Sequence, residues 1–234
     1  MIKACLTIDD GPTQLTPAFV DYLNAKGITP VLYFYGRQIE RHFDEGVYAL
    51  QQGAIVGNHS YSHPHFSELS AEACIREIDM QEELLKELFD AAGVKREHKL
   101  FRFPFGDKGG DNKERIQAHL REKQFSRIDD RAIDAPWYKQ QGLDRDIDAL
   151  WTFDFAEYQL HHGNGFTYDD ILKRIHDRQP ANGSSLLEEG SHHMILIHDH
   201  EQTHEVVPDY YKRLIDHVIE QGVTFETPQF MRAQ

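Results

Sequence analysis

The 234-residue chain has few cysteines, few cations and no long apolar run. Cys5 and Cys74 are its only cysteines, too few for the disulfide framework of a small secreted protein. No window approaches the roughly 20 apolar residues of a membrane-spanning helix. The 25 Lys and Arg against 39 Asp and Glu give a net charge of −14, which repels phosphate backbones and anionic membranes alike. We therefore expect neither nucleic acid nor membrane as a partner.

The amino terminus also lacks the pattern of a secretory signal. The first residues, MIKACLTIDD, contain no basic region followed by a long apolar stretch. If Met1 is the native start, we expect a soluble, cytoplasmic protein. The sequence indicates no oligomeric state.

Short apolar runs alternate with amphipathic segments along the chain. We expect strands at 4–8, 31–35, 54–56, 100–103, 149–154, 194–198 and 223–225. We expect helices at 17–26, 37–52, 71–92, 113–123, 168–177 and 207–221. This order predicts an α/β fold, a (β/α) barrel of about seven parallel strands with outer helices. An open doubly wound sheet is the structural alternative.

No linker, repeat or low-complexity segment divides the chain, so residues 1–234 are predicted to form one domain. The poorly patterned segment 129–148 predicts a long loop over one end of the barrel. It contains Trp137 and Tyr138, which could stack on the apolar faces of sugar rings or simply anchor the loop.

Polar residues lie at or just after the carboxyl ends of five of the predicted strands. They are Asp9 and Asp10, the segment NHSYSH at 58–63, the segment RFPFG at 102–106, Asp154, and His198. In a (β/α) barrel the carboxyl ends of the strands meet on the face where active sites are built. We therefore expect these residues on one rim.

The stretch LTIDDGPT places two mutually repelling carboxylates side by side, which a bound cation would offset. His59 and His63, spaced i and i+4, can share one face of a helical turn and hold one metal ion. With Asp10 they would form a set suited to Zn²⁺ that leaves a position open for water. Asp9 would then be free to act as a base. A surface turn is the alternative for the histidine pair.

The segments TIDDGP, HSYSH, RFPFG, DFAEY and ILIH resemble, in order and spacing, the five motifs of the polysaccharide deacetylases. This family is also called carbohydrate esterase family 4 or the NodB-homology domain. The resemblance extends over residues 6–198 and implies a distorted, TIM-like (β/α) barrel. It also implies metal-dependent removal of N- or O-linked acetyl groups from sugars. The fourth motif departs from the usual Asp-x-x-Asp-Trp, because this chain has Asp154-Phe-Ala-Glu-Tyr158.

The resemblance also implies a role for each matching residue. The predicted catalytic residues are Asp9 as general base, Arg102 as its orienting partner, His198 as general acid and Asp154 as the residue that holds or tunes that acid. The predicted metal ligands are Asp10, His59 and His63. Phe105 is expected to line the substrate groove, and its N–H to bind the oxyanion. The predicted walls of the acyl pocket are Trp151, Tyr158 and Ile195. The remaining histidines, His200 among them, are expected on loops or the surface.

These roles predict a zinc-dependent hydrolase that deacetylates N-acetylated oligo- or polysaccharides by cutting a carbon–nitrogen amide bond, not a peptide bond. Asp9 would take a proton from zinc-activated water, and His198 would protonate the leaving amine. Cobalt, nickel and manganese are the alternative ions. One alternative function is hydrolysis of a small non-sugar amide, imide or formamide. Another is an inactive glycan-binding module, which the complete set of catalytic residues disfavours.

Overall fold

The computed structural model describes residues 1–232, so residues 233 and 234 of the predicted domain lie outside the described residues. The strands are β1 (Ile2–Gly11), β2 (Val31–Phe34), β3 (Ile55–Asn58), β4 (Ser126–Ile128), β5 (Phe153–Asp154), β6 (His192–His198), β7 (Val223–Phe225) and β8 (Phe230–Arg232). The α-helices are α1 (Thr16–Ala25), α2 (Gly36–Arg41), α3 (Phe43–Gln51), α4 (Ala71–Ala92), α5 (Lys113–Glu122), α6 (Pro136–Gln140), α7 (Tyr168–His176), α8 (Glu201–Val206) and α9 (Tyr210–Glu220). None of these helices is both long and apolar enough to cross a membrane.

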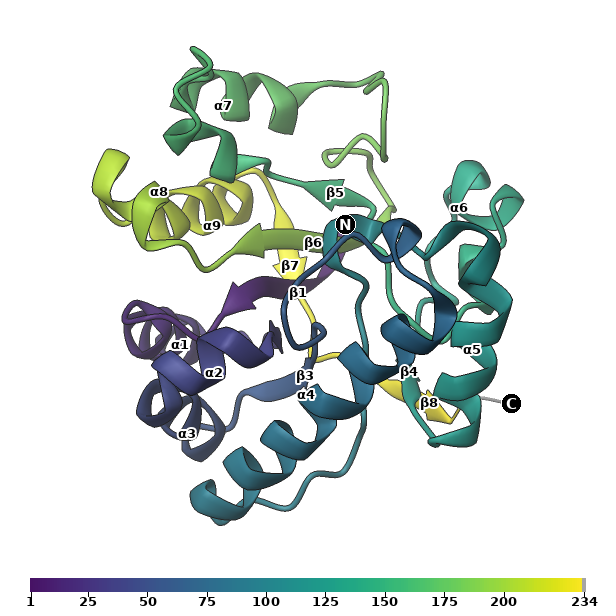
Figure 1. Ribbon diagram of the computed structural model, residues 1–234. Helices are drawn as coiled ribbons and strands as arrows, with labels where there is room; N and C mark the ends of the chain where they lie inside the picture. The colour runs from purple at the N-terminus through teal and green to yellow at the C-terminus, as the bar shows by residue number, and fades with distance from the viewer. Residues whose placement is uncertain (233–234) are drawn as a thin grey trace.

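Six parallel strands form the main sheet, in the order β3-β2-β1-β6-β5 with β7 also paired to β1. Figure 1 shows helices around the outside of the strands, with α1, α2 and α3 on one side and α5 and α6 on the other. Among the described residues, the sheet continues beyond β3 only through one parallel bridge, between Asn58 and Phe101, and β4 pairs with antiparallel β8. The expected (β/α) architecture is therefore present in a distorted form.

Several element boundaries differ from the prediction. The strand expected at 100–103 is reduced to the bridge at Phe101, and the strand expected at 149–154 is reduced to β5. The helix expected at 37–52 is broken at His42, whose ψ of 47° is not helical, into α2 and α3. The segment 129–148 contains α6, so it is not a plain loop.

The bounds predicted for helix α4 are confirmed at both ends. At the start the Ser70 hydroxyl accepts a hydrogen bond from the Ala73 N–H, satisfying one free donor of the first turn. At the end Gly93 has a φ of 67°, the left-handed conformation that favours glycine.

Alternation along β1 and β6 decides which side chains reach the active-site rim. Leu6 and Ile8 pack in the core between the sheet and its helices, together with Ile195. Cys5 and Met194 belong to a second apolar cluster on the inner side of the sheet. Because successive side chains of a strand point to opposite faces, residues of β1 and β6 in register share a face. Asp9 and His198 are such a pair, at the carboxyl ends of their strands.

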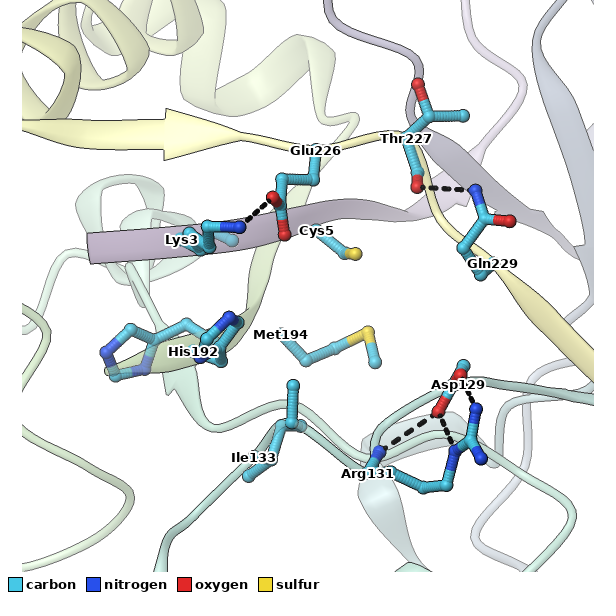
Figure 2. Close-up of a pocket in the computed structure, with 13 residues that line it drawn as sticks. Lys3, Cys5, Asp129, Arg131, Ile133, His192, Met194, Glu226, Thr227 and Gln229 are labelled. Atoms are coloured by element: carbon cyan, nitrogen blue, oxygen red, sulfur yellow. Dashed lines mark hydrogen bonds and ion pairs between the residues drawn. The ribbon is translucent and has the colours of Figure 1, made fainter. Parts of the chain in front are cut away.

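A cavity of about 440 Å³ lies at the opposite end of these strands, beside Lys3 and His192. Figure 2 shows that its charged side chains pair with one another. The Lys3 ammonium lies 2.5 Å from the Glu226 carboxylate, and the Arg131 guanidinium lies 2.6 Å from the Asp129 carboxylate. These four charges are therefore satisfied within the protein.

Candidate active site

The predicted site residues gather around a cavity of about 290 Å³ at the carboxyl ends of the strands. Its lining consists of Asp9, Asp10, His59, His63, Phe105, Trp151, Asp154, Tyr158, His162, Leu196, His198 and His200. Two predicted site residues, Arg102 and Ile195, are buried outside this lining.

Both carboxylates of the Asp-Asp pair reach the cavity because the end of β1 is irregular. In a regular strand, adjacent side chains would point to opposite faces. Here the pairing of β1 with β2 shifts between Asp9 and Gly11, and Asp10 has a φ of 71°. This left-handed backbone is tolerated by aspartate, and it turns the second carboxylate toward the site.

The loop after β3 brings both predicted histidine ligands to Asp10. His63 Nε2 lies 3.1 Å from Asp10 Oδ1, and His59 Nε2 lies 3.6 Å from the same oxygen. Ligand atoms of all three residues lie within 4.8 Å of one another. The expected helical turn is absent, because Ser60 and His63 have φ values of 66° and 58°. The i, i+4 histidines converge through a left-handed bend instead.

The donor set fits a divalent cation. His59 Nδ1 lies 2.8 Å from the Arg102 carbonyl oxygen, which can only accept, so Nδ1 carries the proton and Nε2 keeps its lone pair. Burial lowers the pKa of His59 to about 4, which keeps the imidazole neutral at physiological pH. Apart from its close contacts with His59 and His63, buried Asp10 Oδ1 has no hydrogen-bond partner within residues 1–232. Two imidazoles and one carboxylate with a free oxygen are the donors that Zn²⁺ prefers.

Arg102 orients Asp9 from beneath the cavity, as the sequence predicted. Its Nη1 donates to Asp9 Oδ1 at 2.9 Å and to the Thr7 hydroxyl at 2.7 Å. Its Nε donates to the Ala149 carbonyl at 2.9 Å. Arg102 and Asp9 are 1% and 2% exposed, so the pair is shielded from water and Asp9 Oδ1 is fixed in place. Asp9 Oδ2 is left facing His59, at 3.6 Å from its Nε2.

His198 is held by Glu157, not by Asp154. Of the two roles predicted for Asp154, holding His198 is wrong, whereas tuning agrees with its charge, which helps to raise the pKa of His198. Glu157 Oε1 lies 3.0 Å from His198 Nδ1 and also accepts from the His198 backbone N–H at 2.5 Å. Asp154 accepts instead from the Ala156 N–H. Ala156 has a φ of 56°, and this turn brings the buried Glu157 beneath the histidine. The signal was present in the sequence, because Glu157 occupies the position of the second Asp in the fourth motif.

The charges around His198 favour its protonated form. Burial lowers its pKa, but the negative charges of Glu157, Asp10 and Asp154 outweigh burial and raise it to about 10. Burial raises the pKa of Asp154 to about 6, against the opposing effect of His198. At neutral pH His198 therefore carries a proton that it can donate.

His200 contacts Asp10, one of the three predicted metal ligands Asp10, His59 and His63, here called the metal triad. The sequence analysis did not predict this contact. His200 Nε2 lies 2.8 Å from Asp10 Oδ2, and its ring stacks on His198 with centroids 5.3 Å apart. Burial raises the pKa of Asp10, but His200 and His63 outweigh burial and hold it well below its usual range. The spacing of His198 and His200, i and i+2 after a strand, was the available signal that both face one side.

Two of the three residues predicted to form the walls of the acyl pocket lie at the cavity. Trp151 and Tyr158 line the cavity, and the Tyr158 ring meets His198 edge-on at 4.9 Å. The prediction that Ile195 lines the pocket is wrong. Its side chain is fully buried in the helix-facing core, and Leu196 lines the cavity instead. Alternation explains this, since the residue two before His198 shares its face.

Phe105 forms an exposed edge of the cavity. It is 55% exposed, has a φ of 58°, and stacks on His65 with centroids 4.0 Å apart. The Phe105 N–H as oxyanion donor stays a prediction.

The family model described as polysaccharide deacetylase matches residues 2–123, about half of the chain. The chain belongs to the polysaccharide deacetylase family. The matched segment contains Asp9, Asp10, His59, His63 and Arg102 and ends before Asp154 and His198.

Similar proteins include a peptidoglycan deacetylase and a chitin deacetylase. A peptidoglycan-N-acetylglucosamine deacetylase of Bacillus cereus is 28% identical over 106 residues, which cover 45% of this chain and 37% of that protein. Chitin deacetylase 1 of Cryptococcus neoformans is 29% identical over 102 residues, which cover 44% of this chain and 21% of that protein. The matches thus span well under half of these relatives.

The fold is shared over nearly the whole chain. The crystal structure of a polysaccharide deacetylase from Bacillus cereus superposes with a TM-score of 0.63 and 23% identity, covering 97% of this chain and 92% of that one. This likeness confirms the distorted (β/α) barrel over an open doubly wound sheet.

Proposed function

We propose that this polysaccharide deacetylase family member is a metal-dependent hydrolase that removes acetyl groups from N-acetylated sugars. The observation that supports the proposal is the convergence of the Asp10, His59 and His63 donors, the Asp9 carboxylate and the His198 imidazole around one cavity. Zinc is the ion that the Asp10, His59 and His63 donors favour. A divalent ion bound there supplies Lewis-acid polarisation of the acyl carbonyl and of water.

Asp9 is the base in this proposal. Arg102, whose Nη1 also donates to the Thr7 hydroxyl, holds Asp9 Oδ1, so Oδ2 is the oxygen that takes the proton of the attacking water. The buried guanidinium fixes this carboxylate in place through Oδ1, without competing for Oδ2.

His198 is the acid. Glu157 occupies Nδ1, so Nε2 is the atom that delivers a proton to the departing nitrogen. An amine is a poor leaving group without that proton, and a histidine with a raised pKa retains it at neutral pH. Glu157 is a positioning residue, because it fixes the ring and stabilises the imidazolium.

Openings on both sides of the cavity favour a sugar chain over a small amide. Asp10, His63 and His200 also line a neighbouring cavity of about 520 Å³. Phe105, Trp151 and Asp154 also line another of about 540 Å³ on the other side. A small amide would be better matched by a closed cup.

The test is acetate release from N-acetylglucosamine oligomers by the zinc-loaded protein, with Asp9→Asn as the inactive control. We expect release that stops on chelation and returns with zinc. Hydrolysis of small amides or formamides with no release from any oligomer would overturn the proposal. A cytoplasmic location also stays a prediction, which cell fractionation would check.

A further inference from the structure

Both tryptophans of the chain line one cavity beside the active site. This space of about 540 Å³, here called the tryptophan cavity, shares Phe105, Trp151 and Asp154 with the catalytic cavity. Trp151 therefore lies at the border between the two spaces. Trp137, from α6, lines only the outer one of the pair.

Hydrogen bonds fix the residues that form the outer wall of the tryptophan cavity. Trp137 Nε1 donates to the Ser184 hydroxyl at 3.0 Å, and the Ser184 N–H donates to the Thr152 carbonyl at 2.8 Å. Gly183, with a φ of 81°, lies close to the Thr152 carbonyl oxygen, because a Cβ added to Gly183 would lie only 2.8 Å from that oxygen. Three segments far apart in sequence are thus tied together around the indole.

The remaining lining supplies planar polar groups. Arg174, Gln141 and Asn182 line the cavity, and Arg174 Nε donates to the Asp154 carbonyl at 2.5 Å. This bond places the guanidinium beside the backbone of Asp154, which also lines the 290 Å³ cavity of the active site. Aromatic faces pack against the C–H faces of a sugar ring, and amide and guanidinium groups hydrogen-bond its hydroxyls.

We propose that the tryptophan cavity is a subsite for the sugar unit next to the one that is deacetylated, with Trp137 as its stacking surface. The proposal rests on the proposed function, because it places the acetylated unit in the catalytic cavity. It makes the preferred substrate a chain of at least two N-acetylhexosamine units. A monosaccharide would leave the indole of Trp137 without a partner.

The first experiment uses the fact that all tryptophan fluorescence of the chain arises at this cavity. The zinc-loaded Asp9→Asn protein is titrated with N-acetylglucosamine oligomers of one to four units. We expect a saturable change in emission for the longer oligomers, at concentrations on the order of tenfold below those needed for the monosaccharide. Equal affinities for one and four units would overturn the subsite.

The second experiment compares Trp137→Ala and Trp137→Phe in the active protein. The readout is the ratio of kcat/KM for the trimer to kcat/KM for 4-nitrophenyl acetate, in which a loss of folded protein cancels. For Trp137→Ala we expect this ratio to fall on the order of tenfold, through KM. Trp137→Phe, which keeps an aromatic face, should restore most of it. An unchanged ratio in Trp137→Ala would overturn the proposal.

Failure of the subsite and failure of the proposed function give different results. Acetate release with no dependence on chain length or on Trp137 would leave the deacetylase standing and remove the subsite. Length-dependent fluorescence with no acetate release from any oligomer would leave the subsite standing and overturn the proposed reaction.

Discussion

The two halves of the active site differ in how directly the sequence determines them. The ligand half comprises Asp9, Asp10, His59, His63 and Arg102, and it lies within the segment that matches the family. The acid half comprises Asp154, Glu157, Tyr158, His198 and His200, and it lies beyond that segment. Each predicted contact of the ligand half is present, whereas the acid half contains a wrong partner for His198 and an unpredicted contact to Asp10.

The difference follows from the elements that carry each half. The ligand half is built on the ten-residue β1 and on the loop that leaves β3. In the acid half, His198 ends the seven-residue β6, but the residues that surround it depend on the two-residue β5, the 3-10 helix η5 (Glu157–His161) and the turn at Ala156 between them. Long paired strands constrain where their last residues point, whereas a short strand followed by a turn leaves that to tertiary packing.

The largest expected effect is loss of the metal from the ligand half. His59→Ala should abolish stoichiometric zinc binding and activity, because it removes one of three ligands from a buried site. Elemental analysis and calorimetric titration with zinc measure this, with circular dichroism as the check on folding. Full zinc content in the variant would contradict the ligand assignment.

The two adjacent aspartates should then separate into two roles. Asp9→Asn should keep the metal and lose on the order of 10²–10⁴-fold in kcat, because the base is removed while the triad stays intact. Asp10→Asn should weaken zinc binding itself. The matched pair is measured by metal content and turnover, and the reverse pattern would exchange their roles.

A smaller effect is expected at His200, which connects the halves through Asp10 Oδ2. His200→Leu should weaken zinc affinity by about 10–100-fold, because the carboxylate ligand loses the donor that orients it. His200→Gln should restore much of the affinity, since its amide can place an N–H near the former Nε2. Isothermal titration with zinc is the measurement, and equal affinities in Leu and Gln variants would argue against a positioning role.

The partner of His198 should show in the pH profile. Glu157 stabilises the imidazolium, so its charge helps raise the pKa of His198 to about 10. Activity requires the protonated form and is lost as pH rises through that value. Glu157→Gln should therefore move the basic limb of kcat/KM to lower pH, by at least about one unit. Asp154→Asn should move it less, and the opposite ranking would restore Asp154 as the partner.

The sequence was sufficient for the order of strands and helices and for the ligand half of the site. Gly93 marked the end of α4, and the Asp-Asp and His-x-x-x-His spacings identified three residues that the structure brings together. It was not sufficient for the break at His42, where no glycine or proline marks the end of α2. That break and the turn at Ala156 depend on packing between segments distant in sequence.

Ile195 is a different kind of error. The strand period of two, applied back from His198, already assigns Leu196 to the cavity face, so the sequence contained the correction. Glu157 likewise stood in the fourth motif at the acidic position.

The central claim is that the acid half supplies a proton to the leaving nitrogen while the ligand half holds the metal and the base. The direct test is a paired assay of His198→Ala on an N-acetylglucosamine oligomer and on 4-nitrophenyl acetate. Loss on the amide should be on the order of 10²–10⁴-fold, and loss on the ester much smaller, because 4-nitrophenolate leaves without a proton. An equal loss on both substrates would contradict the claim, because His198 would then support the site as a whole.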